Sequence, residues 1–375
     1  MDNTEKVKIL YFVDRLRHGG IQQLLIELLK NIDKEKIQVD VLVFDDGITY
    51  PLEDEVRKLG SNLYKIDGWI ITPLSYIKQK KVLDRFFKEH HDYNVVHLNS
   101  SSKNFQVLKE AKKYGIPIRI SHAHNVGFQT KNRIKIFIGN ILKNQLIKST
   151  TDFFACSNLA GEWLFGKEIV KLGKFKIIHN AVDYNKFKFN KECREKIRSD
   201  LKIENNCILF GNIGRFTNQK NHKFLIDIFN EIHKKNKGTK LILIGIGEKE
   251  DEIKQKVSEL GLREDVIFAG FKNNANEYMS VIDIFLMPSL YEGLPVVGVE
   301  AQCSGLPCFF SSTVTNEVKI TDNVKFISLE KTSEEWADEI LTSNVKRKDS
   351  TDMLKQKGYF IEDMVADLEK TYLKK

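Results

Sequence analysis

Two carboxylates eight residues apart carry the strongest chemical signal in this sequence. Glu292 and Glu300 lie in the stretch Ser289–Cys308, SLYEGLPVVGVEAQCSGLPC, on either side of a predicted helix start. Pro295 suits the first helical turn, because the N–H that proline lacks would have no partner there. Gly305 can take the left-handed conformation that ends a helix. The spacing therefore predicts one carboxylate before a short helix and one inside it.

The helix predicted here, VVGVEAQC, is almost wholly apolar, so we expect it to be buried. An ionised Glu300 inside it costs free energy unless hydrogen bonds reach its carboxylate. The free N–H groups and positive dipole end at the helix start suit a phosphate, which would lie at Gly293, Leu294 and Pro295. A ribose diol would then contact Glu300. The alternative is a buried glutamate held by an arginine or by backbone N–H groups.

Two basic residues occupy a second position where an anion could bind. Arg215 and Lys220 lie between a predicted strand, 207–214, and a predicted helix, 222–235. Arginine can contact a phosphate through two parallel hydrogen bonds, whereas lysine acts as a mobile point charge. The alternative is an ordinary solvated loop.

The N-terminal half offers weaker signals. Gly19 and Gly20 separate a predicted strand from a helix, where glycine lets the backbone approach a ligand, although a plain tight turn is the commoner reason for such a pair. His97, His122 and His124 fall at the carboxyl ends of predicted strands, where ligands of parallel sheets bind. No carboxylate or cysteine is near them in sequence, so we do not expect a metal site.

The elements that position these residues alternate between strand and helix, which predicts an α/β fold with parallel sheets covered on both faces. The pattern breaks at 183–189 and resumes at Cys207, so we predict two domains, 1–185 and 186–355. Residues 356–375 form a last helix, expected to pack back on the first domain. The expected strands are 6–13, 38–45, 62–67, 94–101, 116–125, 151–157, 174–182, 207–214, 240–247, 265–271, 284–289, 306–312 and a segment near 328–330.

Composition narrows the class of protein. The chain has 375 residues, 42% of them hydrophobic and 29% charged, which fits two globular cores with a charged surface. It contains no run of eighteen apolar residues and no N-terminal signal-peptide pattern, so we expect a cytoplasmic protein. Five cysteines without a C-x-x-C pair indicate reduced thiols and argue against a zinc site or a disulfide framework.

The net charge of +8 is concentrated in one part of the chain. Residues 1–185 carry 29 basic and 21 acidic side chains, and from Lys103 to Ser149 there are ten basic residues and one acid. Within that part, 131–149 has a helical apolar stripe with basic residues opposite, which is typical of a helix that lies on an anionic membrane surface. The alternative is an ordinary surface helix whose apolar stripe packs on the sheet. Few aromatic residues are interleaved with the charges, so we do not expect nucleic-acid binding.

The order of these motifs resembles the retaining glycosyltransferases of family 4, which have the GT-B fold of two Rossmann-like domains with parallel sheets facing a central cleft. The resemblance covers nearly the whole chain. It rests on GG at 19–20, SHAHN at 121–125, GRFTNQKN at 214–221, GIGE at 245–248, FAGF at 268–271 and E-x7-E at 292–300. The variant is similar to bacterial enzymes that build capsular or exopolysaccharide repeat units on a lipid carrier.

The resemblance implies roles for four side chains. Arg215 and Lys220 match the basic pair that neutralises the donor diphosphate, including the charge that develops on the leaving group. Glu300 matches the glutamate that binds the ribose hydroxyls, and Glu292 matches the one beside the donor sugar. No metal or cofactor is then required; the nucleotide sugar, expected to carry UDP, is a substrate.

It also implies backbone and aromatic contacts. The positions whose main chain would lie beside donor or acceptor are Gly19, Gly20, Gly214, Gly293, Leu294 and Pro295. Phe271 and the GIGE turn would lie near the uracil. A histidine of SHAHN matches the family residue near the sugar; the candidates are His122 and His124, of which we favour His124. Gln22 replaces a common acidic residue and Cys303 a common small one, which puts the substrate in doubt rather than the activity.

The function implied is retaining transfer of a sugar, from a UDP-hexose or UDP-N-acetylhexosamine, to a lipid-linked saccharide. The enzyme would lie at the inner face of the plasma membrane and contact its anionic surface through the basic helix 131–149. Alternatives are a GT-B nucleotide-sugar epimerase, which needs no acceptor, and a non-catalytic GT-B partner subunit of another transferase. The intact residues Glu292, Glu300, Arg215 and Lys220 argue against the latter. The sequence predicts neither the sugar, the linkage nor the oligomeric state.

Overall fold

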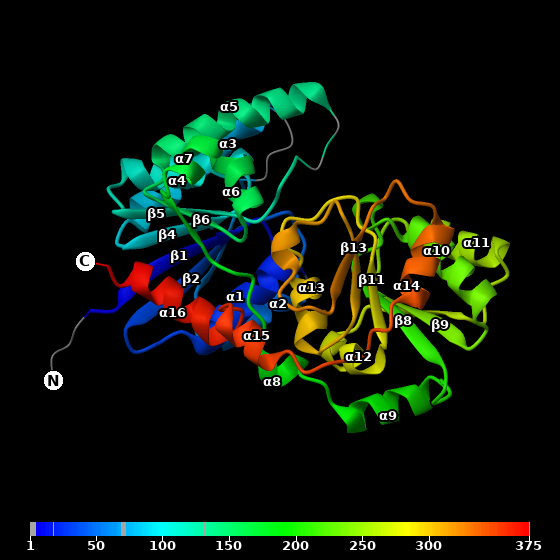
Figure 1. Ribbon diagram of the computed structural model, residues 1–375. Helices are drawn as coiled ribbons and strands as arrows, with labels where there is room; N and C mark the ends of the chain where they lie inside the picture. Colours follow the sequence, from blue (N-terminus) through cyan, green and yellow to red (C-terminus); the bar gives the residue numbers. More distant parts are fainter. Residues whose placement is uncertain (1–4, 18, 69–72, 129, 131, 375) are drawn as a thin grey trace. The chain divides into compact units, whose positions relative to one another are not determined.

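The computed structural model describes residues 5–17, 19–68, 73–128, 130 and 132–374. These residues form two compact units (Figure 1). Unit 1 contains the chain up to Asn180 together with the segment from Ile361 onward, and unit 2 is Ala181–Phe360. The sequence had placed the boundaries at 185/186 and 355/356. No helix in the described part of the chain is long and apolar enough to cross a membrane.

Unit 1 is built on a seven-stranded parallel sheet in the order β3-β2-β1-β4-β5-β6-β7. Its strands are β1 Val7–Val13, β2 Ile37–Phe44, β3 Leu63–Ile66, β4 Val95–Asn99, β5 Ile118–Ala123, β6 Asp152–Ala155 and β7 Phe175–Ile177. The central strands are rich in valine, isoleucine and leucine and are buried on both faces, as a sheet covered by helices requires.

Helices cover both faces of this sheet. The helices are α1 Gly20–Asn31, α2 Pro51–Lys58, α3 Pro73–Glu89, α4 Phe105–Lys113, α5 Arg133–Ser149, α6 Asn158–Phe165, α7 Lys167–Lys171 and α16 Ile361–Tyr372, with a 3-10 turn at Ser102–Asn104. Figure 1 shows α1, α2 and α16 on one face and α3, α4 and α5 on the other. Helix α16 packs on α1, and its side chains at helical spacing, from Ile361 to Tyr372, are buried there.

Unit 2 repeats the plan with a six-stranded parallel sheet in the order β10-β9-β8-β11-β12-β13. The strands are β8 Ile208–Ile213, β9 Thr239–Ile244, β10 Val266–Gly270, β11 Ile284–Met287, β12 Cys308–Ser311 and β13 Val324–Ile327. The last strand ends before the predicted 328–330 segment; its Val324 and Ile327 side chains are buried, and Leu329 packs against the same core from outside the strand.

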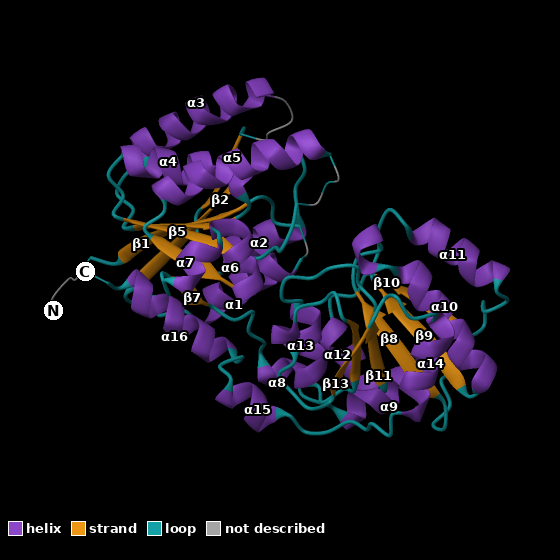
Figure 2. Cartoon of the chain, turned by 45° about the horizontal axis from the view of Figure 1, so that its top comes forward, coloured by secondary structure: helices purple, strands orange, loops and turns teal. Residues whose placement is uncertain are grey.

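The helices of unit 2 also form two layers. They are α8 Tyr184–Phe187, α9 Lys191–Asp200, α10 His222–Lys235, α11 Glu250–Glu259, α12 Ala275–Val281, α13 Val296–Cys303, α14 Ser333–Thr342 and α15 Thr351–Gln356, with 3-10 turns at Asn218–Lys220 and Asn316–Val318. Figure 2 shows α10, α11 and α14 along one face of the sheet and α12 and α13 along the other. Apolar residues of α10 and α14 pack with β8, β9 and β10 into one core.

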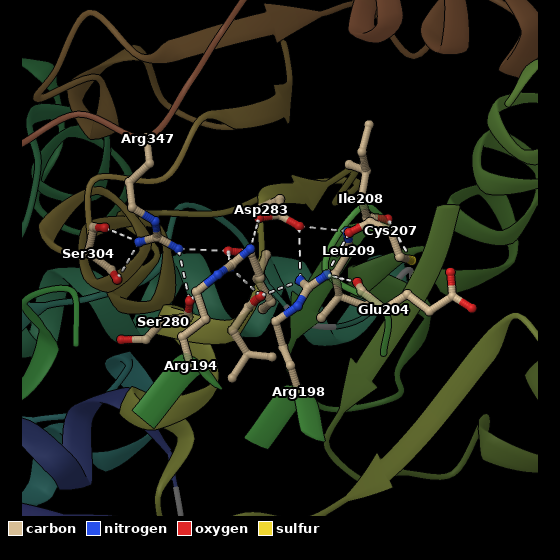
Figure 3. A network of polar contacts seen from close by, with 12 residues as sticks. Arg194, Arg198, Glu204, Cys207, Ile208, Leu209, Ser280, Asp283, Ser304 and Arg347 are labelled. Carbon is tan, nitrogen blue, oxygen red and sulfur yellow. Dashed lines mark hydrogen bonds and ion pairs between the residues drawn. The ribbon is translucent and has the colours of Figure 1, made fainter. Parts of the chain in front are cut away.

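Three arginines of unit 2 bind the chain at the end of α12 and Asp283, which follows it (Figure 3). Arg194 and Arg198 of α9 form ion pairs with Asp283 of 2.6 and 3.2 Å. Arg347 donates to the carbonyl oxygen of Ile282 at 2.7 Å and to Ser304 Oγ at 2.8 Å. Burial lowers the pKa of the Arg347 guanidinium to about 10. The carbonyl groups at the end of α12 thus accept hydrogen bonds from arginines of α9 and of the segment after α14.

Candidate active site

The predicted donor residues lie in unit 2 at the carboxyl ends of neighbouring strands. Gly214 and Arg215 directly follow β8, and Lys220 ends the 3-10 turn Asn218–Lys220. Glu292 follows β11, while Glu300 is in α13. Because β8 and β11 are paired, the two loops that follow them leave the sheet side by side.

Hydrogen bonds join those two loops. The Leu290 N–H donates to the Gln219 carbonyl at 2.8 Å, and the Gln219 side-chain amide donates to the Tyr291 carbonyl at 3.0 Å. The same amide nitrogen lies 3.2 Å from Glu292 Oε2. Asn221, which adopts a left-handed conformation with φ 55°, donates to the Pro288 carbonyl at 3.1 Å. Neither Gln219 nor Asn221 was predicted as a site residue, because their role depends on a loop some seventy positions away.

The two basic residues have different surroundings. The Lys220 ammonium forms an ion pair with Glu292 Oε1 at 2.7 Å and is largely buried. Since an ammonium has three donors, two remain for another anion. The Arg215 side chain is exposed, and no residue in the described part of unit 2 pairs with its guanidinium. The loop therefore presents one cation held by Glu292 and one exposed cation at the end of β8.

Glu300 lies in a setting that favours its neutral form. Its side chain is partly buried in α13, and burial raises the pKa of its carboxyl to about 7, although Lys186 and Lys220 favour the charged form. No arginine or backbone N–H among the described residues donates a hydrogen bond to it. The structure thus lacks the internal partner that the alternative of a held, buried glutamate requires. Lys186, in the segment that the sequence suggested as a hinge, was not predicted to be near this carboxyl.

The backbone positions have clear local roles. Gly293, Leu294 and Pro295 precede the first turn of α13, where Pro295 caps the helix rather than occupying its first turn as predicted. Phe271 directly follows β10, and its side chain is 43% exposed. At Gly245, where φ is 144°, a Cβ atom would lie 2.0 Å from the Gly214 carbonyl oxygen. The GIGE turn thus packs directly on the backbone that carries Arg215.

In unit 1, His124 belongs to a group of three histidine rings. Its ring centroid lies 4.0 Å from that of His122, and the His122 and His97 rings stack at 5.3 Å. His97 Nδ1 lies 2.6 Å from the hydroxyl of Tyr372 in α16. Burial lowers the pKa values of all three imidazoles, that of His124 to about 4, so at neutral pH the rings are uncharged.

Exposure distinguishes the two histidines that the sequence left open. His122 is buried, whereas His124 is only partly buried. Its Nε2 atom lies 2.9 Å from the Asn99 side-chain oxygen. The ring contacts shown here are between side chains. Among the described residues no three His, Cys, Asp or Glu side chains are grouped as metal ligands.

The glycine pair lies where the sequence predicted it, at the start of α1. Gly19 has an extended backbone with φ 179°, and Gly20 is the first residue of the helix. A Cβ atom at Gly19 would lie 2.7 Å from the Gln22 side-chain oxygen, and the Gln22 amide donates to the Arg15 carbonyl at 2.8 Å. The Gln22 side chain thus closes the turn.

Two family models match the chain along most of its length. The model described as Glycosyltransferase Family 4 matches residues 18–186, and the model described as Glycosyl transferases group 1 matches residues 193–359. The chain therefore belongs to the glycosyltransferases, with a family 4 domain followed by a group 1 domain. Its two parallel-sheet domains are those of the GT-B fold, as predicted.

The chain is similar to several bacterial glycosyltransferases. The chain is 28% identical to the putative glycosyltransferase EpsF of Bacillus subtilis, over 99% of this chain and 97% of that protein. It is 26% identical to UDP-Gal:alpha-D-GlcNAc-diphosphoundecaprenol alpha-1,3-galactosyltransferase of Escherichia coli, over 82% of this chain and 80% of that one. The crystal structure of Anabaena Alr3699/HepE with UDP and glucose has the same fold, with a TM-score of 0.80 and 19% identity, over 97% of this chain and 99% of that one.

Proposed function

We propose that this glycosyltransferase moves a sugar from a UDP-sugar to a lipid-linked saccharide, with retention at the anomeric carbon, in capsule or exopolysaccharide synthesis. The observation that carries the proposal is the pair of joined loops in unit 2. They bring Arg215, Lys220, Glu292 and the start of α13 to the same end of one sheet. Cations, free helix N–H groups and a carboxylate at one sheet edge suit a nucleoside diphosphate.

The leaving group explains why the cations are needed. As the bond between the anomeric carbon and the phosphate oxygen breaks, negative charge grows on UDP and the sugar becomes oxocarbenium-like. Arg215, Lys220 and the start of α13 would stabilise that charge. The acceptor hydroxyl forms the new bond on the same face of the sugar and gives its proton to the departing phosphate. In this proposal no metal ion or cofactor takes part.

The two glutamates have separate roles in this scheme. Glu300 would accept hydrogen bonds from the ribose hydroxyls, which supply the donors that the fold does not. Glu292, bound by Lys220 and Gln219, would orient the ammonium group and contact the donor sugar. Because it is already held in this way, the proposal does not use it as a nucleophile. His124 would contact the sugar from unit 1 as a neutral hydrogen-bonding group, and the uracil would lie near Phe271.

The relatives support the acceptor and the donor. The name of the E. coli relative gives a UDP-galactose donor and a diphosphoundecaprenol-linked acceptor, and the HepE crystals hold UDP and glucose. By analogy we infer a lipid-linked acceptor for this chain and a peripheral position at the inner face of the plasma membrane. Contact with that anionic surface would involve helix α5, which corresponds to the predicted basic segment 131–149; Lys131 lies outside the described residues.

A panel of UDP-sugars tests the proposal. The full chain should bind one of them saturably and hydrolyse it slowly without an acceptor, whereas GDP- and ADP-sugars should bind weakly. A lipid-linked saccharide should then be extended with the anomeric configuration of the donor, which proton NMR of the product reports. A product of inverted configuration would contradict retention. Turnover of the UDP-sugar to its epimer without an acceptor would favour the epimerase alternative.

A further inference from the structure

A hydroxyl group of the last helix contacts the histidines of unit 1. The Tyr372 hydroxyl lies 2.6 Å from His97 Nδ1, and the other ring nitrogen of His97, Nε2, lies 3.2 Å from His122 Nδ1. All three side chains are buried. Tyr372, His97 and His122 thus form a hydrogen-bonded row. In the described part of the chain the Tyr372 hydroxyl has no second hydrogen-bond partner, and His122 Nε2 has none at all.

The two polar contacts of His97 fix the orientation of its ring. A ring turned over about the bond between Cβ and Cγ would place carbon atoms against the Tyr372 hydroxyl and against His122 Nδ1, and carbon forms neither contact as well. Aromatic neighbours hold the plane of the ring. The Tyr11 ring lies edge-on to His97 with 4.9 Å between centroids, and the Phe154 ring lies edge-on at 5.8 Å.

Hydrogen bonds in the row can run in two directions, because each contact needs one hydrogen and one lone pair. In the first direction Tyr372 donates to His97 Nδ1, His97 donates from Nε2 to His122 Nδ1, and His122 carries its proton on Nε2. In the second direction His122 donates from Nδ1 to His97 Nε2, and His97 donates from Nδ1 to the Tyr372 oxygen. Burial keeps all three groups neutral, since it lowers the pKa values of both imidazoles and raises the pKa of the Tyr372 hydroxyl.

The two directions differ in the number of buried groups without a partner. The first leaves one such group, the N–H of His122 Nε2. The second leaves two, the O–H of Tyr372 and the lone pair of His122 Nε2. Since each unpaired buried group costs free energy, the first direction should be populated about tenfold or more over the second.

The row ends against the histidine that the proposed function uses. The His124 ring lies on the His122 ring, with centroids 4.0 Å apart and planes at 35°. Reversal of the row would move the His122 proton from Nε2 to Nδ1 and would turn round the dipole of the ring that His124 contacts. A dipole so close, in a buried site of low dielectric constant, changes the strength of the hydrogen bonds that His124 forms.

We propose that Tyr372 and His97 are positioning residues, which keep the proton of His122 on Nε2 and so set the electrostatic environment of His124, a role that rests on the proposed function because there His124 contacts the sugar. Neither Tyr372 nor His97 touches the substrate in this scheme. Helix α16 thus supplies unit 1 with a functional hydroxyl as well as a cover for α1.

Nitrogen NMR of the full chain, labelled with ¹⁵N-histidine, tests the direction of the row. The nitrogen shifts distinguish a ring nitrogen that carries a proton from one with a lone pair, so they report each tautomer directly. In the wild-type chain both His97 and His122 should carry the proton on Nε2. Their signals are assigned by their loss in His97→Gln and His122→Gln. A wild-type His122 with its proton on Nδ1 would overturn the proposed order.

Tyr372→Phe tests the source of that order, because it removes the hydroxyl and keeps the ring. Without the hydroxyl each direction leaves one unpaired N–H and one unpaired lone pair, so the two tautomers of His122 should become about equally populated. About half of the chains would then hold the reversed row, and kcat for transfer to a lipid-linked saccharide should fall at least about twofold. A hydroxyl that only fastened the helix would change the Tm and leave the tautomers as they are in the wild type.

Tyr11→Phe is the matched control. The Tyr11 ring is also buried against His97, but its hydroxyl forms no hydrogen bond within the described part of the chain. This variant should keep the wild-type tautomers and the wild-type kcat. Unchanged tautomers in Tyr372→Phe, with its fold verified by circular dichroism, would overturn the positioning role, as would an unchanged kcat.

The spectra and the transfer assay can fail separately. A chain that shows the expected tautomers but transfers no sugar would retain the order of the protons and lose the proposed function, and the positioning role with it. A chain that transfers sugar equally well with and without the Tyr372 hydroxyl would retain the proposed function and lose only the positioning role.

Discussion

Arg215 and Lys220 are five positions apart, yet the fold treats them differently. Lys220 is held by Glu292 at 2.7 Å, whereas Arg215 is exposed without a partner in the described part of unit 2. An ion pair prepared in advance keeps Lys220 in position before the donor arrives. Arg215 has no such ion pair in the described part of unit 2, so we expect its contribution to depend more on what is bound.

The two cations therefore give a first prediction. Lys220→Ala and Arg215→Ala should each lower the transfer rate by about a hundredfold to a thousandfold, as loss of a donor that stabilises developing charge does elsewhere. Both should also weaken UDP binding in calorimetry. The control is Lys223→Ala, which removes an exposed lysine of the same region that pairs with Glu252. Wild-type turnover in Arg215→Ala or Lys220→Ala would contradict a diphosphate site here.

Glu300 gives a second prediction, on pH. Burial raises the pKa of its carboxyl to about 7, and the charged form is the better acceptor for ribose hydroxyls. UDP affinity of the wild-type chain should therefore fall as the pH drops through about 7. Glu300→Gln should bind UDP about tenfold more weakly at pH 8, as loss of a hydrogen bond to a charged group predicts. Calorimetry across the pH range should show a flatter dependence in this variant.

Glu300→Gln, which should weaken UDP binding, should increase the stability of the chain without ligand. The pKa of the Glu300 carboxyl is higher in the folded chain than its ordinary value, so the folded state holds the proton more tightly than the unfolded state. The free energy of unfolding then decreases as the pH rises between the ordinary value and about 7. Without ligand, Glu300→Gln should raise Tm at pH 8, where the wild type carries a partly buried charge. An unchanged Tm and unchanged UDP affinity together would sink the assigned role.

The sequence identified some of these residues as site candidates but did not predict which residues they contact. The types and spacing of Glu292, Glu300, Arg215 and Lys220 were enough to nominate them as a set. The contact of His97 with Tyr372 links positions 275 residues apart, and nothing in the local sequence of either predicts it. Local sequence records what chemistry a side chain can do, whereas the partner depends on how the strands are ordered in the sheet.

At the scale of elements, a glycine turn positions the loop that carries Arg215. The GIGE turn after β9 lies against the backbone after β8, and the Phe216 N–H donates to the Ile246 carbonyl at 3.1 Å. A Cβ atom at Gly247 would lie 2.4 Å from the Phe216 carbonyl oxygen, so the approach is close at both glycines of the turn. The position of Arg215 therefore depends on residues that need not contact the ligand.

Two glycine-to-alanine substitutions, one in the turn and one outside it, test that dependence. Gly245→Ala places a methyl group against the Gly214 carbonyl and adopts an unfavourable φ of 144°, so it should displace the loop and weaken UDP binding at least about tenfold. Gly261→Ala is the matched control, because φ there is 70° but no atom lies within 4 Å of the added carbon. It should cost about 1 kcal/mol of stability and leave UDP binding unchanged. Equal affinities in the two variants would show that the contact is dispensable.

The sequence predicted which segments are helices and strands better than it predicted which face of a helix is exposed. Alternating apolar runs predicted nearly all strands, but the helices α7, α8, α9 and α15 were missed; the sequences of α9, KECREKIRSD, and α15, TDMLKQ, are mostly polar. The stripe of α5 was predicted with two possible orientations. What decides between them is the notch at Gly139 that takes the Phe128 ring, a contact that a helical wheel does not contain.

At the scale of the whole molecule, segments that are far apart in the sequence belong to the same unit. Unit 1 is completed by the last helix, which returns after unit 2, and the Asp33 N–H donates to Glu369 of that helix at 2.8 Å. The sequence analysis predicted this return of the last helix. It placed both boundaries about five residues away, since neither junction is marked by a proline- or glycine-rich linker.

This arrangement predicts unequal behaviour of the two units as fragments. Residues 181–360 are continuous in sequence, contain a hydrophobic core and are within the usual size of a domain, about 50–250 residues. Expressed alone, this fragment should unfold cooperatively in urea and bind UDP like the full chain, because Arg215, Lys220, Glu292 and Glu300 all belong to it. It should transfer no sugar, because the proposed acceptor contacts are in unit 1.

A fragment of residues 1–180 should behave differently, because it lacks α16. Without that helix the apolar surface of α1 is uncovered and His97 loses the hydroxyl of Tyr372. We expect a broad, early urea transition, and recovery of a cooperative one when 361–375 is fused behind residue 180 by a flexible linker. Should the 181–360 fragment fold cooperatively yet bind no UDP, the nucleotide site would have to include residues of unit 1, and the assignment of donor binding to unit 2 alone would be wrong.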